Sequence, residues 1–177
     1  RTNHYNFDLN RDWAFLTQVE SQERIKLYVQ WKPQVAVDLH EMGSSSTYFF
    51  FPAATPINAN YPAQLMKWQR IYGEGNAAAF DHYGWKYYTQ QGFDLLYPSF
   101  GDSWTSFMGA TGMTYEQAGG GSAGVVLKRG ENDYLTLKQR LWDHFTTSMA
   151  TLKTSATNKV DRLRDFHDFF VSAIDEG

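Results

Sequence analysis

One short stretch, VAVDLHEMGSSS at residues 35–46, constrains the fold most. The run at residues 34–40 is nearly all apolar rather than cleanly alternating, which is typical of a strand in a parallel sheet. His40 and Glu41 stand where this strand runs out into a loop of glycine and serines. Because strand ends are where a rigid sheet aims side chains into a cleft, we expect a buried strand here that carries a functional site.

Two helices are expected to begin with capping boxes. Thr17 with Glu20 opens the first, within residues 12–33, and Thr136 with Gln139 opens the second near the C-terminus. Apolar residues continue at helical spacing after a polar break around residues 155–158, which indicates one more helix.

A further helix is expected to start at Pro62, although Gly73 and Gly75 weaken the helical pattern. Short strands are expected at residues 85–89, 93–97 and 113–118, and the aromatic run at 47–52 is expected to be another strand or a loop that lines the cleft. Strands mixed with long helices predict an α/β fold, with a mixed, mostly parallel sheet flanked by helices.

Composition excludes several classes of protein. The chain has 177 residues, enough for one domain with a real core. Its net charge of −3 argues against nucleic-acid binding, and no apolar run approaches the length of about 20 residues that spans a membrane. The chain contains no cysteine, which rules out disulfides and thiolate metal ligands.

His40 and Glu41 first suggest a zincin, in which His-Glu-x-x-His places two ligands one helical turn apart. The second histidine would stand at position 44, which is Ser44, and the context is a strand rather than a helix. The zincin hypothesis therefore fails.

Three other segments place polar side chains beside apolar residues. FDLNRDW at 7–13 places an amide beside a guanidinium, LLYPSFGDSW at 95–104 places a tyrosine before a turn, and GMTYEQAGGG at 112–121 places a glutamate in a short apolar strand. Together with the strand that ends in His40, and in this order, these segments resemble the zinc metallocarboxypeptidases of the carboxypeptidase A family. The resemblance spans roughly residues 1–120 and implies a carboxypeptidase-like (phosphorylase/hydrolase-like) fold.

The resemblance also implies roles in the reaction. His40 would be a protein ligand of a catalytic zinc, and Glu116 would be the general base that takes a proton from the attacking water. Arg1 corresponds to the arginine that polarises the scissile carbonyl in the family. A neighbouring carboxylate, Glu41, is expected to face away from the site or to bond locally, and His82, His144 and His167 are expected to be surface or packing residues.

Further residues correspond to those that hold the substrate. Asn10 and Arg11 would bind its terminal carboxylate, since an arginine presents a planar fork that fits a carboxylate. Tyr97 would close over the same end. Asp102 falls near the position that sets side-chain preference in the family, where an aspartate favours a basic C-terminal residue.

The chain departs from the family in its metal ligands. The family's other two zinc ligands come as His-x-x-Glu upstream of the Asn-Arg pair, and no histidine in this chain is followed by glutamate at that spacing. We therefore expect residues 1–155 to be the C-terminal part of a catalytic domain, present as a fragment. Residues 156–177 are expected to form a trailing helix.

The sequence thus predicts a zinc-dependent exopeptidase that removes C-terminal residues from peptides with a free carboxyl end. An amidase or deacylase on the same scaffold, and a metal-free module that binds carboxylate-ended ligands, are the alternatives. The fragment alone is expected to be inactive. From the resemblance, the parent protein is expected to be secreted or periplasmic.

Overall fold

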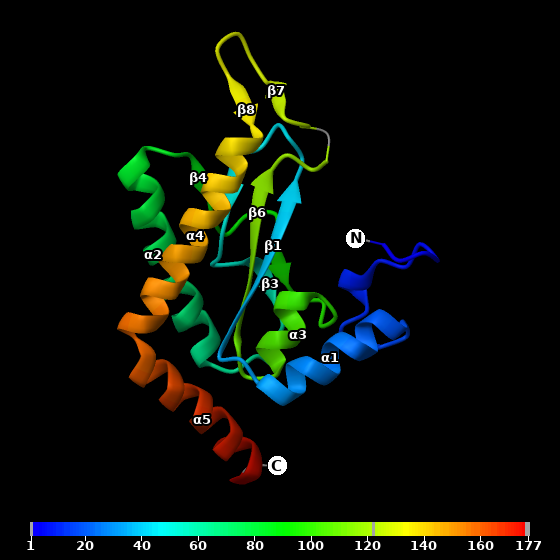
Figure 1. The fold of residues 1–177 in the computed structure, drawn as a ribbon. Coiled ribbons are helices and arrows are strands. Elements are labelled where there is room, and N and C mark those ends of the chain that lie inside the picture. The colour runs from blue at the N-terminus through cyan, green and yellow to red at the C-terminus, as the bar shows by residue number, and fades with distance from the viewer. Residues whose placement is uncertain (1, 122, 176–177) are drawn as a thin grey trace.

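The structure is a computed structural model that describes residues 2–121 and 123–175 (Figure 1). Its central sheet has the strand order β1-β6-β2-β4. The two long strands, β1 (Val35–Met42) and β6 (Thr111–Ala118), lie side by side along their whole length. The short strands β2 (Tyr48–Phe49) and β4 (Tyr87–Tyr88) complete the sheet.

The sheet is mixed and mostly parallel, as predicted. β1 pairs with β6 in parallel, β2 pairs with β4 in parallel, and β2 joins β6 in the antiparallel direction. Helices cover the sheet on opposite faces. On one face lie α2 (Gln64–Tyr83) and α4 (Leu137–Thr157), which pack against each other and against β6. On the other face α3 (Gly101–Phe107) packs against β1 and β6 (Figure 1).

The remaining elements surround this core. A short 3-10 helix, η1 (Leu9–Arg11), precedes α1 (Val19–Trp31), and α5 (Lys159–Asp175) follows α4. Two small sheets pair β3 (Ala54–Ile57) with β5 (Asp94–Leu95) and β7 (Val126–Lys128) with β8 (Tyr134–Thr136). In the described part of the chain, no helix has the length and apolar character to cross a bilayer.

The main core is aromatic and lies between the sheet and α2. Tyr48, Phe49, Phe50 and Phe51 are almost fully buried, together with Trp68 and other side chains of α2. Burial of a large aromatic side chain contributes about 2–3 kcal/mol, so this cluster fixes α2 and the loop after β2 against β6. The aromatic run at residues 47–52 is therefore core, and only its first part is a strand.

The helix at Pro62 continues through both glycines, contrary to what their helix propensity indicates. A Cβ at Gly73 would overlap the carbonyl oxygen of Phe51, and a Cβ at Gly75 would overlap the Thr154 hydroxyl. Both glycines therefore serve close packing, of α2 against the loop after β2 and against α4. This packing outweighs the cost of about 1 kcal/mol that each glycine carries inside a helix.

Two other local predictions need correction. Thr17 does not cap α1, because the carboxylate of Asp12 accepts hydrogen bonds from Thr17 N, Thr17 Oγ1 and Gln18 N at 2.8–2.9 Å and holds the entry to the helix. Nor is the strand at residues 34–40 fully buried. β1 ends the sheet in the described chain, and Leu39 is 49% exposed. The capping box at Thr136 is confirmed, since its hydroxyl accepts from Gln139 N at 3.1 Å.

Candidate active site

The register between β1 and β6 brings the first two predicted site residues together. His40 stands opposite Glu116, and one step earlier on the same face Asp38 stands opposite Thr114. Side chains two apart on a strand share a face, so these four point to the side of the sheet that α3 covers. Glu116 is 7% exposed, and its Oε1 lies 3.8 Å from His40 Nδ1.

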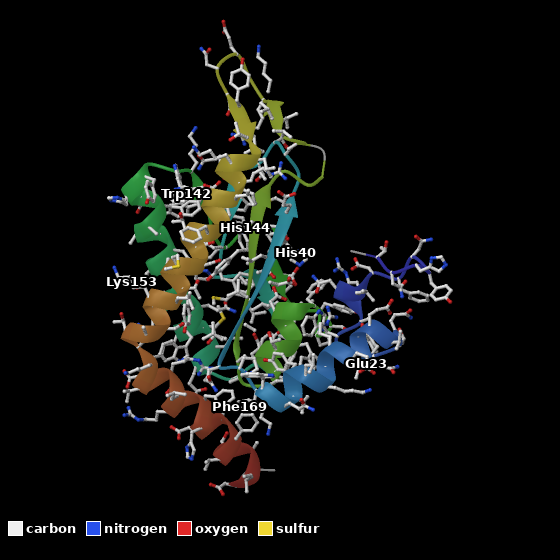
Figure 2. The ribbon with its side chains drawn as sticks, viewed as in Figure 1. Glu23, His40, Trp142, His144, Lys153 and Phe169 are labelled. Atoms are coloured by element: carbon white, nitrogen blue, oxygen red, sulfur yellow. The ribbon has the colours of Figure 1, made fainter. Side chains whose placement is uncertain are left out.

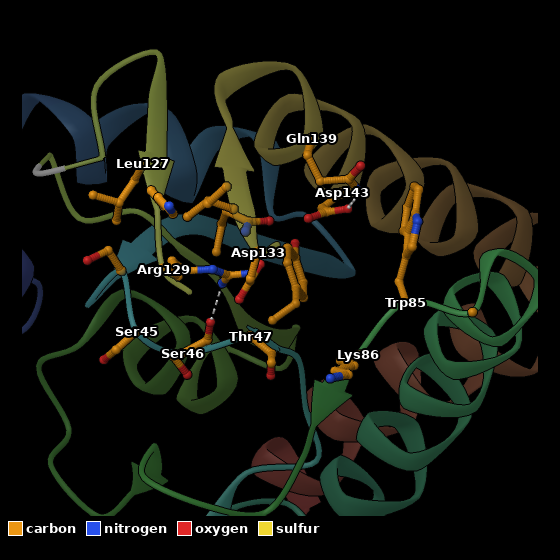
Figure 3. Close-up of a pocket in the computed structure, with 16 residues that line it drawn as sticks. Ser45, Ser46, Thr47, Trp85, Lys86, Leu127, Arg129, Asp133, Gln139 and Asp143 are labelled. Carbon is orange, nitrogen blue, oxygen red and sulfur yellow. Dashed lines mark hydrogen bonds and ion pairs between the residues drawn. The ribbon is translucent and has the colours of Figure 1, made fainter. Parts of the chain in front are cut away.

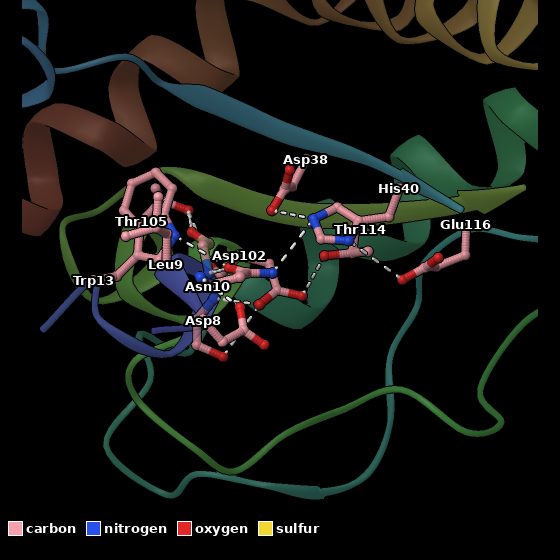
Figure 4. A network of polar contacts seen from close by, with 12 residues as sticks. Asp8, Leu9, Asn10, Trp13, Asp38, His40, Asp102, Thr105, Thr114 and Glu116 are labelled. Atoms are coloured by element: carbon pink, nitrogen blue, oxygen red, sulfur yellow. Dashed lines mark hydrogen bonds and ion pairs between the residues drawn. The ribbon is translucent and has the colours of Figure 1, made fainter. Parts of the chain in front are cut away.

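Asp38 fixes the orientation of the His40 ring. Its Oδ2 lies 2.7 Å from His40 Nε2 (Figure 4). A carboxylate only accepts hydrogen bonds, so this contact requires Nε2 to carry the proton and donate it. Nδ1 is then the nitrogen that faces Glu116. A carboxylate on the far nitrogen of a histidine is the usual support of a metal-binding imidazole.

Asn10 is held rigidly beside this histidine. Its backbone N–H donates to Asp8 Oδ1 at 2.9 Å, the cap of η1. Its side-chain Oδ1 accepts from Gly101 N at 2.9 Å and from Trp13 Nε1 at 3.1 Å. The amide nitrogen therefore points toward His40 Nε2, at 3.3 Å. Because Nε2 donates to Asp38, Asn10 Nδ2 cannot use it as an acceptor and keeps its hydrogens for a ligand.

Arg11 follows directly and is positioned by an aromatic ring. Its guanidinium lies 4.4 Å from the centroid of Phe100, and its Nη1 donates to the Asn10 carbonyl at 2.9 Å. The hydroxyl of Tyr97 donates to the Arg11 carbonyl at 3.3 Å. The Arg11 side chain is 45% exposed and its Nη1 lies 3.8 Å from Asp8 Oδ2, so the guanidinium has one carboxylate beside it and is still accessible to an anion.

Asp102 is the buried carboxylate of the site. It accepts from Thr114 Oγ1 at 2.7 Å and from Ser103 N at 2.6 Å. Burial raises the pKa of this carboxyl, while the hydrogen bonds from Thr114 and Ser103 partly offset the rise. Gly112 permits this arrangement, because a Cβ there would overlap the carbonyl of Asp102 and push α3 off the sheet.

A cavity of about 260 Å³ connects most of these groups. It is referred to below as the front cavity, and the predicted residues that line it are Asn10, Arg11, His40, Asp102 and Glu116. Tyr97 reaches the same place through its bond to Arg11. Arg1 lies outside the described residues, so its predicted role stays a prediction.

The side chains of the front cavity fit a metal ion only in part. His40 offers Nδ1 toward the front cavity, with Nε2 held by Asp38, which suits one zinc ligand. A catalytic zinc keeps three protein ligands, and the described residues contain no group of three His, Asp or Glu side chains arranged to hold a metal. The chain thus fits one ligand position and does not supply the complete set.

Other charged residues near the site have structural partners. Glu41 faces the opposite side of the sheet and forms an ion pair with Arg140 at 2.6 Å. His144, on α4, contacts the Tyr48 hydroxyl at 2.8 Å through Nδ1 and the His40 carbonyl at 3.1 Å through Nε2 (Figure 2). Burial lowers the pKa of His144, in agreement with a packing role for this residue.

Sequence reasoning missed Asp38 and Thr114. The signal for Asp38 was present, because Asp-x-His within one strand places both side chains on the same face. Thr114 stands two residues before Glu116 and is found by the same rule. Its role beside Asp102 depends on α3, which approaches from another part of the chain.

Comparison with known proteins supports the fold. The structure is similar to the crystal structure of a metallo-carboxypeptidase from Burkholderia cenocepacia, with a TM-score of 0.57 and 13% sequence identity. The similarity covers 96% of this chain and 40% of that protein, so this chain spans less than half of the neighbour's length. No family model and no curated protein matches the sequence. The chain therefore has a carboxypeptidase-like α/β fold.

Proposed function

We propose that this chain is the C-terminal part of the catalytic domain of a zinc-dependent carboxypeptidase, which hydrolyses C-terminal residues from peptides. The observation that carries the proposal is the front cavity, where an amide and a guanidinium from η1, an imidazole from β1 and a buried glutamate from β6 converge. A carboxypeptidase-like fold around these groups supports it.

Each residue has a task that suits its position. Arg11 and Asn10 Nδ2 bind the terminal carboxylate of the substrate, since one is charged and accessible and the other has hydrogens left to donate. Tyr97 covers this end from the outer loop. Glu116 takes the proton of the attacking water and passes it to the leaving amine, as a carboxylate beside the reacting bond can.

His40 Nδ1 is the nitrogen that would hold the metal, with Asp38 as its support. When bound, zinc supplies Lewis acidity toward the scissile carbonyl and the attacking water. The two further ligands would come from chain that is not among the described residues. We propose that residues 1–177 alone bind zinc weakly and are inactive.

Asp102 sets the preferred C-terminal side chain in this proposal. Its carboxylate lies at the wall of the front cavity, 6% exposed, and a buried carboxylate gains most from a cationic partner. A lysine or arginine at the substrate's C-terminus supplies that partner. Asp102→Asn should therefore reduce the preference for basic over apolar C-terminal residues.

The deciding experiment uses the longer protein that contains this chain. Values of kcat/KM are measured for matched peptides that end in a free acid or in an amide. The proposal expects hydrolysis of the acids and little of the amides, since an amide lacks the anionic fork that Arg11 binds. Equal rates on both would favour an amidase or deacylase. Binding of the acids without hydrolysis or zinc would favour the metal-free binding module.

A further inference from the structure

A second cavity lies on the opposite face of the sheet from the front cavity. Side chains alternate along β6, so Glu116 points to one face and Gln117 to the other. Gln117 lines a hollow of about 620 Å³ between the loop after β1, the β7–β8 hairpin and the first turns of α4 (Figure 3). We refer to it as the back cavity. None of the predicted site residues lines it.

Gln117 lines the back cavity and has an unused acceptor. The residue is 2% exposed, and its Nε2 donates to the Ala118 carbonyl at 3.2 Å. This hydrogen bond identifies the nitrogen of the amide, and therefore also its oxygen. Its Oε1 is fully buried and accepts no hydrogen bond from any residue in the described part of the chain. Such an orphan acceptor costs roughly 1–3 kcal/mol and is rare in native proteins, so it calls for a donor.

A buried carboxylate lies beside it. Asp143, from α4, lines the same floor and is 6% exposed. Its Oδ1 accepts from Gln139 Nε2 at 2.6 Å. Burial raises the pKa of Asp143 to about 6, although hydrogen bonds from Gln139 and Gln117 and the charge of Arg129 oppose the rise. The floor thus presents an amide oxygen and a carboxylate, a pair that suits an ammonium group.

The mouth of the back cavity has the opposite charge. The guanidinium of Arg129 already has partners, since it forms an ion pair with Asp133 at 2.9 Å and donates to the Ser46 carbonyl at 2.9 Å. Lys86 is exposed at the mouth and forms no ion pair with the residues that the structure describes. A simple cation would meet repulsion at the mouth, and a simple anion would meet repulsion at the floor. A molecule that carries both charges satisfies both ends.

We propose that the back cavity binds a small zwitterion, a free α-amino acid or a dipeptide, with its ammonium on Gln117 and Asp143 and its carboxylate toward Lys86. The size of the cavity suits such a molecule. Trp85 and Leu135 form apolar walls on which an uncharged side chain can pack. This inference does not depend on the proposed function, because it uses residues on the other face of the sheet.

The test is a titration of the 177-residue chain followed by NMR at the Trp85 indole N–H, assigned with Trp85→Phe. L-Leucine is the probe, with leucinamide, which lacks the carboxylate, and N-acetyl-leucine, which lacks the ammonium. The proposal expects a saturable shift with leucine at millimolar concentration and binding at least about tenfold weaker for each analogue. Equal binding of leucinamide, or no shift with any probe up to about 10 mM, would overturn it.

Variants locate the site. Asp143→Asn and Gln117→Leu should each weaken leucine binding by about ten- to a hundredfold, since each removes one acceptor for the ammonium. Lys86→Met changes an exposed residue, leaves the fold intact and should weaken binding by a few-fold. Arg11→Ala alters only the front cavity and should leave the Trp85 titration unchanged. Loss of the signal in Arg11→Ala, or unchanged binding in Lys86→Met and Asp143→Asn together, contradicts the proposal.

Discussion

The carboxylate of Asp38 lies 2.7 Å from Nε2 of His40, while Nδ1 of the same ring faces Glu116 at 3.8 Å. One side of the imidazole is therefore occupied by a structural partner, and the other is directed into the front cavity. Under the proposed function, this asymmetry leaves Nδ1 as the nitrogen that a zinc ion would use.

The first prediction concerns the tautomer of His40. Asp38 should place the proton on Nε2 in the neutral ring. In Asp38→Ala, Asn10 Nδ2 at 3.3 Å becomes the remaining partner of Nε2 and can only donate, so the proton should move to Nδ1. Long-range 1H–15N spectra at about pH 8, above the ordinary histidine range, report the tautomer directly.

The matched control is Glu41→Gln, which changes a carboxylate on the same strand but on the opposite face. It should leave the His40 tautomer as in the wild type. In the longer protein, Asp38→Ala should also weaken zinc binding by about 10- to 100-fold in a chelator competition. A wild-type spectrum with the proton on Nδ1 would contradict the assignment of Asp38.

The second prediction concerns Glu116 in the longer protein. Glu116→Gln preserves shape but cannot accept a proton, so kcat should fall by about 100-fold or more while KM stays within a few-fold. Steady-state kinetics with a free-acid peptide measure both. Glu41→Gln again serves as the control and should keep kcat, and a near-normal kcat in Glu116→Gln would remove Glu116 from the role of base.

The sequence predicted the candidate site better than it predicted the surroundings of that site. His40 and Glu116 stand at the ends of recognisable strands, and strand pairing is enough to bring them together. Asn10 was predicted together with Arg11 from the family resemblance of the segment at 7–13, but its fixed orientation depends on Gly101 N and Trp13. Such contacts join segments far apart in the chain, and no local pattern encodes them.

Predictions from local helix propensity and capping patterns were wrong where tertiary packing determines the structure. Thr17 has the pattern of a helix cap, yet the carboxylate of Asp12 accepts from the N–H groups of Thr17 and Gln18 and holds the entry to the helix instead. The glycines of α2 were expected only to weaken the helical pattern, although each marks a close approach of another segment. No sequence motif indicates the back cavity, because its lining comes from five separate segments that meet only in the folded chain.

The third prediction tests the packing role of Gly73. Gly73→Ala should destabilise the chain by roughly 1–3 kcal/mol despite the better helix propensity of alanine, because the new methyl group meets the backbone of the loop at Phe51. Gly75→Ala meets only the hydroxyl end of Thr154, a side chain that can rotate, and should cost less. Urea unfolding midpoints compare the two. An equal or larger loss in Gly75→Ala would contradict this account.

The fourth prediction follows from Asp143, whose pKa burial raises to about 6. Because this value lies above that of the unfolded chain, the folded state binds more protons between about pH 4 and 6. Asp143 should therefore make the free energy of unfolding decrease as pH rises through this window, by up to about 3 kcal/mol. The measurement is the free energy of unfolding as a function of pH for wild type and Asp143→Asn, and the difference between the two curves gives the contribution of Asp143. Asp133→Asn controls for loss of a carboxylate at the same cavity. A difference in the free energy of unfolding that does not change with pH would contradict the prediction.

The last prediction concerns what Arg11 binds in the longer protein. The Arg11 side chain is 45% exposed, so the site around it is open to water. Removing the side chain therefore leaves no buried charge without a partner in the substrate complex, and the loss of kcat/KM should be moderate. Removing a hydrogen bond to a charged group costs about 1.5–3 kcal/mol, so Arg11→Ala should lower kcat/KM on free-acid peptides by roughly 10- to 150-fold. Activity on the matched amides should change little, which narrows the acid-over-amide preference.

Arg11→Lys should recover only part of this loss, because an ammonium keeps the charge but lacks the planar fork and does not stack on Phe100 as a guanidinium does. Arg129→Ala, on the opposite face of the sheet, is the matched control and should leave the preference intact. The measurement is kcat/KM for acid and amide peptides with wild type and each variant. If Arg11→Ala reduced both activities by the same factor, Arg11 would act on the substrate or the fold in general, and some other group would have to bind the terminal carboxylate.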